Sequence, residues 1–214
     1  MNPITDTLYQ SEPEHPFGNN VKTCAYLLKR PDGNILMFSS GTLPRVEARI
    51  RELGGIARQY LNHRDEASES CDWVRRTFDA PLTCHEAERE AIAESCTVDH
   101  TFDRETELHS DLRAIPTPGH CPGSTCYLWQ APDGRRCLFT GDTLFLNDAQ
   151  WRVFVRLGTN AEMISSLRRI ASLEPDVVVP GLFIGDTAYS MIDPPAFKQQ
   201  MDEVIARLNQ GDRH

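Results

Sequence analysis

Apolar residues recur along this chain with two spacings, one typical of helices and the other of strands. In segment 161–173 they return every three or four positions, and they do so again from residue 195 onward. Shorter apolar or β-branched runs that end at turn residues predict strands. The pattern predicts helices over 44–53, 69–78, 86–94, 161–173 and from 195 onward, and strands over 56–61, 81–84, 112–115, 137–140 and 176–179. Alternating strands and helices predict an α/β fold.

An internal repeat divides the chain into two similar halves. Residues 23–44 align without gaps to residues 124–145, and eight of the 22 positions are identical. Each copy has two apolar runs around a Pro-Asp-Gly turn, which is typical of a hairpin whose glycine has a positive φ. Such hairpins are common, so chance similarity is the alternative. If the repeat is genuine, the two halves predict two sheets packed together with helices outside. This is a four-layer αββα sandwich in a single domain over residues 1–214.

Composition narrows the class of partner. The chain is 40% hydrophobic and 25% charged, as in ordinary globular proteins, and 31 acidic residues against 22 basic ones give a formal net charge of -9. This charge disfavours nucleic acid and favours a small-molecule partner. No apolar run is long enough to cross a membrane, and the first residues carry no secretory signal pattern. Seven cysteines without a CxxC pair predict reduced thiols and a cytoplasmic protein. The oligomeric state stays open.

Polar residues with metal-ligand chemistry follow three of the predicted strands. His63 and Asp65 follow the strand over 56–61, His120 lies in a Pro-Gly loop after 112–115, and Asp142 follows 137–140. Two imidazoles and two carboxylates suit zinc, iron or manganese, and an open position on such an ion would hold an acidified water. Each residue also has a structural alternative, since a histidine beside a Pro-Gly turn often bonds the backbone and Asp142 could cap the next segment.

Three strings of the second half resemble motifs of the metallo-β-lactamase superfamily, which includes glyoxalase II-like thioesterases. The strings are TPGHCPGS at 117–124, LFTGDTLF at 138–145 and SLRRIASLEPDVVVPG at 166–181. The resemblance implies an αββα fold with internal duplication. It also implies that His63 and His120 are ligands of a first metal and that Asp142 is the carboxylate that bridges two metals.

The sequence departs from the family at the second metal. Where the family has His-x-His-x-Asp-His, this chain has His63-Arg64-Asp65-Glu66-Ala67-Ser68. The resemblance therefore implies that Asp65 replaces a histidine ligand, and that Ala67 and Ser68 replace an aspartate and a histidine of the second metal. The last family histidine corresponds to Leu182. Three of the four second-site ligands are absent, so a dinuclear centre is not expected.

Three hypotheses follow for the function. The first is a mononuclear metallohydrolase, zinc foremost, in which His63, Asp65, His120 and Asp142 bind the ion and Glu66 is the general base. Its substrate would be a small ester, thioester or amide. The second is a catalytically inactive member of the fold that serves as a ligand-binding or interaction module. The third gives a nucleophilic or ligand role to a thiol, with Cys121 and Cys71 as candidates. Three residues downstream of Asp142 are candidate pocket walls: Trp151, Arg152 and Arg156.

Overall fold

The computed structural model describes residues 1–18 and 20–211. Contacts within the chain group these residues into two compact units, an N-terminal unit (Met1–Asp103) and a C-terminal unit (Arg104–His214). Each unit is a mixed α/β structure, which confirms the predicted class. The prediction of one domain over residues 1–214 stays a prediction.

The N-terminal unit is built on a seven-stranded sheet with the order β1-β2-β4-β5-β6-β7-β8. The strands from β1 to β5 pair antiparallel, and those from β5 to β8 pair parallel. The strands are β1 (Asn2–Pro3), β2 (Leu8–Gln10), β4 (Tyr26–Leu28), β5 (Ile35–Met37), β6 (Arg58–Tyr60), β7 (Leu82–His85) and β8 (His100–Phe102), with β3 (Lys22–Thr23) outside this sheet.

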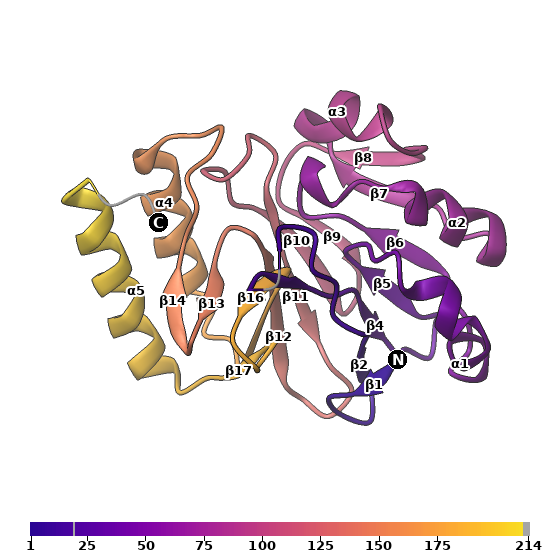
Figure 1. The fold of residues 1–214 in the computed structure, drawn as a ribbon. Coiled ribbons are helices and arrows are strands. Elements are labelled where there is room, and N and C mark those ends of the chain that lie inside the picture. Colours follow the sequence, from indigo (N-terminus) through magenta and orange to yellow (C-terminus); the bar gives the residue numbers. More distant parts are fainter. Residues whose placement is uncertain (19, 212–214) are drawn as a thin grey trace. The chain divides into compact units, whose positions relative to one another are not determined.

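Helices connect the parallel strands of this unit and supply its core. They are α1 (Glu47–Glu52), α2 (Glu69–Phe78) and α3 (Arg89–Ala93), with the 3-10 turns η1 (Leu43–Val46), η2 (Arg64–Glu66) and η3 (Glu86–Glu88). Ile50 of α1 and Val74 of α2 pack with Leu27 and Leu36 of the sheet in one buried cluster. The apolar stripes of α1 and α2 are therefore buried on the sheet, as the sequence spacing requires. Figure 1 shows these helices beside the strands that they connect.

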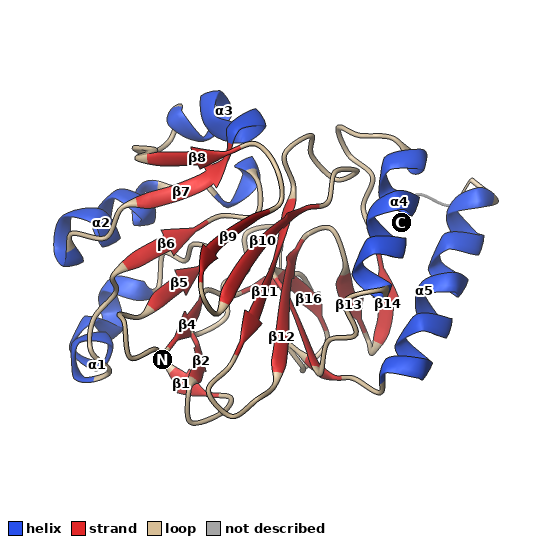
Figure 2. Ribbon diagram, turned by 180° about the vertical axis from the view of Figure 1, so that it is seen from behind, coloured by secondary structure: helices blue, strands red, loops and turns tan. Residues whose placement is uncertain are grey.

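The C-terminal unit contains a six-stranded sheet with the order β17-β15-β12-β11-β10-β9 and a smaller set of strands paired as β14-β13-β16. Its helices α4 (Asn160–Ala171) and α5 (Pro194–Asn209) lie side by side (Figures 1 and 2). The strands are β9 (Thr106–His109), β10 (Leu112–Pro116), β11 (Thr125–Gln130), β12 (Arg136–Gly141), β13 (Phe145–Asn147), β14 (Gln150–Arg152), β15 (Val177–Pro180), β16 (Leu182–Ile184) and β17 (Ser190–Met191).

Local sequence determines where α4 and α5 begin. Thr159 and Glu162 form a capping box at the start of α4, in which the threonine hydroxyl accepts from the Glu162 amide and the glutamate accepts from the Thr159 amide. Asp193 caps α5 by accepting from the Ala196 amide. These contacts satisfy amides that have no partner within the first helical turn.

Both copies of the sequence repeat form antiparallel hairpins, β4–β5 and β11–β12. Gly33 and Gly134 have φ values of 100° and 89°, so the predicted turn geometry is confirmed. In the N-terminal unit the hairpin is followed by η1, α1 and the parallel strand β6, whereas in the C-terminal unit β13 and β14 precede α4 and the parallel strand β15. The registers differ by one residue, because Tyr26 pairs with Met37 whereas Tyr127 pairs with Phe139. The shared hairpins support an internal duplication, which stays a prediction.

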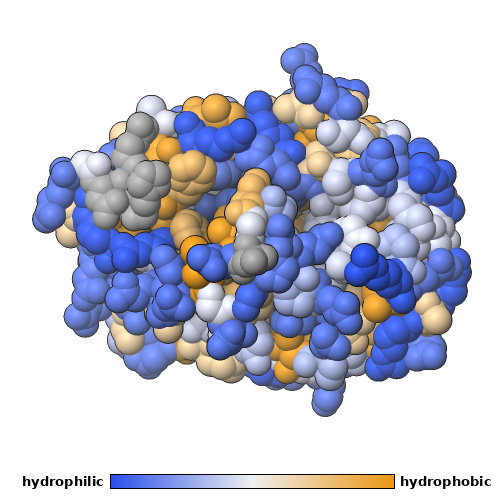
Figure 3. Space-filling model, in the orientation of Figure 1, coloured by the Kyte–Doolittle hydropathy of each residue, from blue (hydrophilic) through white to orange (hydrophobic). Residues whose placement is uncertain are grey.

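Polar side chains dominate the face of the molecule in Figure 3, on which apolar groups form smaller areas. None of the helices in residues 1–18 and 20–211 combines the length with the apolar run that a membrane crossing needs.

Candidate metal centre

The first candidate ligands lie in the loop that leaves the parallel strand β6 of the N-terminal unit. His63 has an extended backbone, η2 follows it directly, and α2 begins after Ser68. His63 is 1% exposed. Its Nδ1 lies 3.0 Å from the Asn62 side-chain oxygen, and the carboxylate of Glu66 lies 3.6 Å from the same nitrogen. Oxygen acceptors on this side place the proton on Nδ1 and the lone pair on Nε2.

Asp65 stands on the other side of the same imidazole. Its Oδ2 lies 3.6 Å from His63 Nε2, which is too long for a hydrogen bond between these two atoms. An ion with tetrahedral ligands at about 2.0–2.2 Å holds neighbouring ligand atoms about 3.3–3.6 Å apart. The pair of Asp65 and His63 therefore has the spacing of two ligands of one ion.

Glu66 and a buried ion pair fix the shape of this loop. Glu66 Oε2 accepts from the Asn62 amide at 2.6 Å, and the Glu66 carbonyl accepts from the Ser39 hydroxyl. Arg64 donates from its main-chain amide at 3.0 Å and from Nε at 2.6 Å to the buried carboxylate of Glu88. The contacts of Glu66 are those of a residue that positions His63, and its predicted role as general base stays a prediction.

The second histidine lies in the loop between β10 and β11 of the C-terminal unit. His120 is 1% exposed, and its Nδ1 lies 2.8 Å from the Phe154 carbonyl oxygen. A carbonyl only accepts, so Nδ1 is the donor and Nε2 carries the lone pair. Leu157 donates its amide to the His120 carbonyl at 2.8 Å. The segment around Phe154 and Leu157 thus holds both the backbone and the ring of His120.

Two glycines allow the close packing of this loop. Gly119 has a φ of +137°, and a Cβ there would lie 2.7 Å from the Met163 Cα in α4. A Cβ on Gly158 would lie 2.6 Å from the Gly119 carbonyl oxygen. Ser166 of α4 also donates to the Pro118 carbonyl at 2.7 Å. The Pro-Gly loop is therefore held against the first turns of α4, and steric contacts explain the glycine at 119 and the glycine at 158, which precedes α4.

Asp142 follows β12, and its Oδ2 lies 3.9 Å from His120 Nε2. This distance is slightly longer than that between neighbouring ligand atoms of a tetrahedral ion, but it is too short to place the two groups in separate sites. Nearby, the Thr140 hydroxyl donates to the Leu144 carbonyl at 2.7 Å and the Thr143 amide donates to the Thr140 carbonyl at 3.1 Å. These bonds fix the turn from which the Asp142 side chain extends.

Each unit thus presents the same arrangement, a buried histidine whose Nδ1 faces an oxygen acceptor and whose Nε2 faces a carboxylate. Metal-binding histidines have this form, because the bond at the second ring nitrogen fixes the tautomer and the ring orientation. The donor chemistry of both pairs fits zinc and other borderline divalent cations. All four residues were candidates from the sequence and stay predicted ligands, whereas Asn62 and the Phe154 carbonyl were missed because acceptors beside a histidine have no sequence pattern.

The thiols do not form a reactive group in this structure. All seven cysteines are buried and none forms a disulfide, and Cys121 has no exposed surface. Burial raises the pKa of Cys84 and of Cys137 to about 12, so both are protonated at neutral pH. The hydrogen bond from Cys96 lowers the pKa of Cys71, which is nevertheless only 2% exposed. Burial disfavours a nucleophilic role for Cys121 or Cys71.

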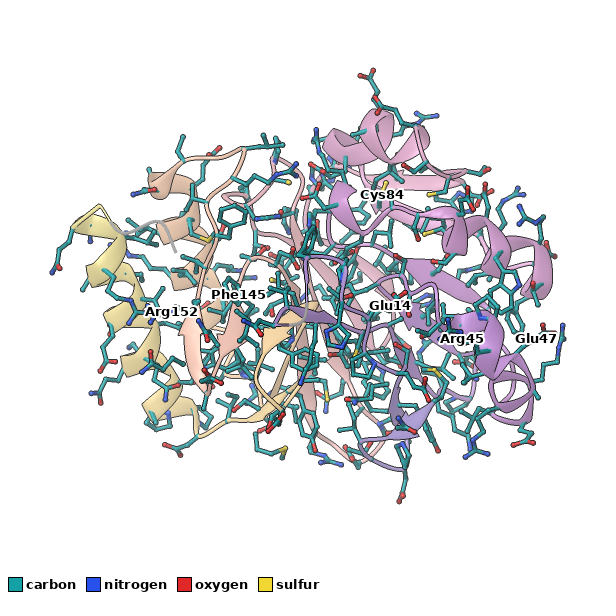
Figure 4. All side chains as sticks on the ribbon, viewed as in Figure 1. Glu14, Arg45, Glu47, Cys84, Phe145 and Arg152 are labelled. Atoms are coloured by element: carbon teal, nitrogen blue, oxygen red, sulfur yellow. The ribbon has the colours of Figure 1, made fainter. Side chains whose placement is uncertain are left out.

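The predicted wall residues have different surroundings. Trp151 is 5% exposed, its ring centroid lies 5.7 Å from that of Phe197 in α5, and its indole donates to Gln200 at 3.0 Å. The prediction that it lines a pocket is therefore wrong, because the residue is part of the core. Arg152 donates to Gln150 on β14, and Figure 4 shows it beside Phe145, its partner in the sheet register. Arg156 is exposed.

The residues that the family resemblance aligns with second-metal ligands are small or apolar. Ser68 shares a hydrogen bond of 2.8 Å with Ser70 at the start of α2, and Ala67 packs against a buried cluster of the N-terminal unit. Leu182 begins β16 and is 9% exposed. Their surroundings are those of structural residues.

Fold and donor chemistry together define a class, that of chains with the metallo-β-lactamase fold. Residues 97–182 match the model of the metallo-beta-lactamase superfamily. A metallo-beta-lactamase from Pontibacter korlensis is similar over 97% of both chains, with 16% identity and a TM-score of 0.74. These findings confirm the resemblance to the metallo-β-lactamase superfamily and its fold.

Two further solved structures have the same fold. One is a metallo-beta-lactamase from Cronobacter sakazakii (Enterobacter sakazakii), a HARLDQ motif mutant, with 15% identity over 98% of this chain and 95% of that one and a TM-score of 0.70. The other is BJP-1, a subclass B3 metallo-beta-lactamase of Bradyrhizobium japonicum, with 16% identity, coverage of 94% and 93%, and a TM-score of 0.65.

Proposed function

We propose that this chain is a metal-dependent hydrolase that binds one divalent ion, zinc foremost with iron or manganese as alternatives, through His63, Asp65, His120 and Asp142. One observation carries the proposal. In both units a buried imidazole has its Nδ1 against an oxygen acceptor and its Nε2 at 3.6 or 3.9 Å from a carboxylate oxygen. Histidines that only fill a core have no need of this repeated arrangement.

The reaction we propose is hydrolysis of a small ester, thioester or amide. A bound divalent ion supplies Lewis acidity, which activates water and polarises a carbonyl oxygen. The imidazoles of His63 and His120 serve as neutral ligands because their Nδ1 protons are held by oxygen acceptors. Asp65 and Asp142 contribute negative charge, which favours a divalent cation. The formal net charge of -9 supports a small-molecule substrate over nucleic acid. A cytoplasmic location stays part of the proposal.

The donor set supports the proposal of a single ion. Ala67, Ser68 and Leu182 offer no imidazole and no carboxylate at the positions of a second metal. Zinc titration of metal-free protein should therefore saturate near one equivalent. Saturation near two equivalents would contradict the mononuclear proposal.

Metal analysis of protein purified without chelator tests the ligand set directly. Wild type should carry close to one equivalent of a transition metal, and His63→Ala and His120→Ala should each carry less than about a tenth of an equivalent. His100→Ala is the matched control, because this exposed histidine of β8 should leave the metal content unchanged. Wild-type protein that binds less than about a tenth of an equivalent after exposure to zinc, iron and manganese would overturn the proposal.

Turnover distinguishes the hydrolase from a catalytically inactive binding module. A panel of p-nitrophenyl esters, acyl thioesters and anilides should reveal turnover that His120→Ala abolishes. Full metal occupancy without turnover on any of these substrates would favour the inactive module. Glu66→Gln then separates two roles: a general base loses kcat at full metal content, whereas a residue that positions His63 loses metal.

A further inference from the structure

Exposed large apolar side chains are rare on this chain and are concentrated beside His120. Among the described residues there are four, namely Phe17, Phe154, Leu157 and Met191. Two of the four, Phe154 at 38% and Leu157 at 51% exposure, belong to the segment between β14 and α4 that hydrogen-bonds to His120. Single exposed apolar residues are common, but two beside one candidate ligand require a reason.

The segment that carries them is fixed to the histidine. The Phe154 carbonyl accepts from His120 Nδ1 at 2.8 Å, and the Leu157 amide donates to the His120 carbonyl at 2.8 Å. The Phe154 ring centroid lies 5.6 Å from that of His120, at an interplanar angle of 49°. Gly158 packs on Gly119, which precedes His120. The main chain that carries the two apolar side chains is therefore bonded to His120 at two points.

Neighbouring residues explain why these side chains face outward. Val153 and Val155 are 1% and 5% exposed, so the alternate positions of the extended segment point into the core and turn Phe154 the other way. The buried valines on both sides anchor the main chain at Phe154, so its exposed ring is held in place although the ring itself is not buried. This arrangement is typical of a contact surface supported by a rigid element.

We infer that Phe154 and Leu157 form an acyl-binding wall that makes the substrate an ester or thioester with an apolar acyl chain. The inference rests on the proposed function, because the scissile carbonyl is taken to approach the ion held by His120. An acyl chain that extends from this carbonyl along the segment would cover both side chains and remove their apolar surface from water. An acetyl group is too short to gain much from this contact.

The test compares p-nitrophenyl hexanoate with p-nitrophenyl acetate. For Phe154→Ala and Leu157→Ala we expect kcat/KM for hexanoate to fall about tenfold, mostly through KM, with acetate changed less than about threefold. Met191→Ala is the matched control, because this residue of the same unit is 59% exposed but belongs to β17, outside the segment that hydrogen-bonds to His120. It should leave both substrates unchanged.

Equal losses for both esters in Phe154→Ala and Leu157→Ala would mean that the residues act through His120, and this result would overturn the inference. Calorimetric binding of hexanoate and acetate separates the inference from the proposed function. Wild type could hydrolyse no ester and still bind hexanoate more tightly than acetate, with the preference lost in both variants. That result would refute the hydrolase proposal and support the acyl-binding wall. If hexanoate binds no more tightly than acetate, the wall is refuted.

Discussion

Substitution of Gly119 by alanine tests whether the close packing of the Pro-Gly loop on α4 requires a residue without a side chain. The residue has a φ of +137°, a region that L-residues rarely adopt. A Cβ there would also lie 2.7 Å from the Met163 Cα and 2.8 Å from the Met163 main-chain nitrogen. Both contacts are with the backbone of α4, which cannot move aside without shifting the helix.

The expected loss has two parts. Left-handed backbone costs a non-glycine residue about 1–2 kcal/mol, and overpacking of a close contact costs about 1–3 kcal/mol, so Gly119→Ala should lose about 2–5 kcal/mol in free energy of unfolding. Two other glycines separate these parts. Gly134 has a φ of +89° with no atom within 4 Å of an added Cβ, whereas an added Cβ on Gly158 meets the Gly119 backbone at 2.6–2.9 Å.

Urea unfolding followed by tryptophan fluorescence measures all three variants. Gly134→Ala should lose only the backbone part, about 1–2 kcal/mol, and Gly158→Ala only the packing part, about 1–3 kcal/mol. Gly119→Ala should lose the most and should also bind metal more weakly, since His120 follows directly. A loss in Gly119→Ala no larger than that in Gly134→Ala would refute the packing argument.

Two further predictions concern charges of the N-terminal unit. Glu88→Gln removes the buried carboxylate that pairs with Arg64, so the free energy of unfolding measured by urea titration should fall by about 3 kcal/mol. Glu52→Gln, in an exposed ion pair, should lower it by less than about 1 kcal/mol. Equal losses in the two variants would contradict the role of burial. At Asp99, burial acts to raise the carboxyl pKa, but the Arg75 guanidinium and a main-chain amide outweigh it and lower the pKa. A lowered folded-state pKa stabilises the fold above the unfolded-state value and loses this effect as pH falls, so the stability difference between wild type and Asp99→Asn should shrink below about pH 4. A difference that stays constant between neutral and acidic pH would exclude this electrostatic explanation.

Helix positions were predictable because helical spacing extends over many residues. The prediction for 69–78 matches α2 (Glu69–Phe78) at both ends, and that for 161–173 differs from α4 (Asn160–Ala171) by one or two residues. Strands such as β1 (Asn2–Pro3) and β17 (Ser190–Met191) were missed because two residues give no alternation to detect. The helix predicted over 44–53 begins as a 3-10 turn, η1, and continues as α1 over Glu47–Glu52.

The candidate ligands could be proposed from the sequence, but their geometry could not. His120 and Asp142 lie in motif strings and His63 and Asp65 follow a predicted strand, yet the tautomer of each histidine depends on an acceptor that no motif contains. For His120 that acceptor is a carbonyl oxygen 34 positions along the chain. Trp151 was misassigned for the same reason, since only tertiary packing places its indole against α5.

The sequence by itself determined the α/β class, the two hairpins with their positive-φ glycines and the family resemblance. These properties depend on residue type and local spacing, which the chain carries without folding. Tertiary structure decided which nitrogen of His120 faces Asp142, which side chain of the segment 151–157 is exposed, and why Gly119 has no side chain. Each of these depends on atoms that are distant in sequence, so only the packed chain brings them together.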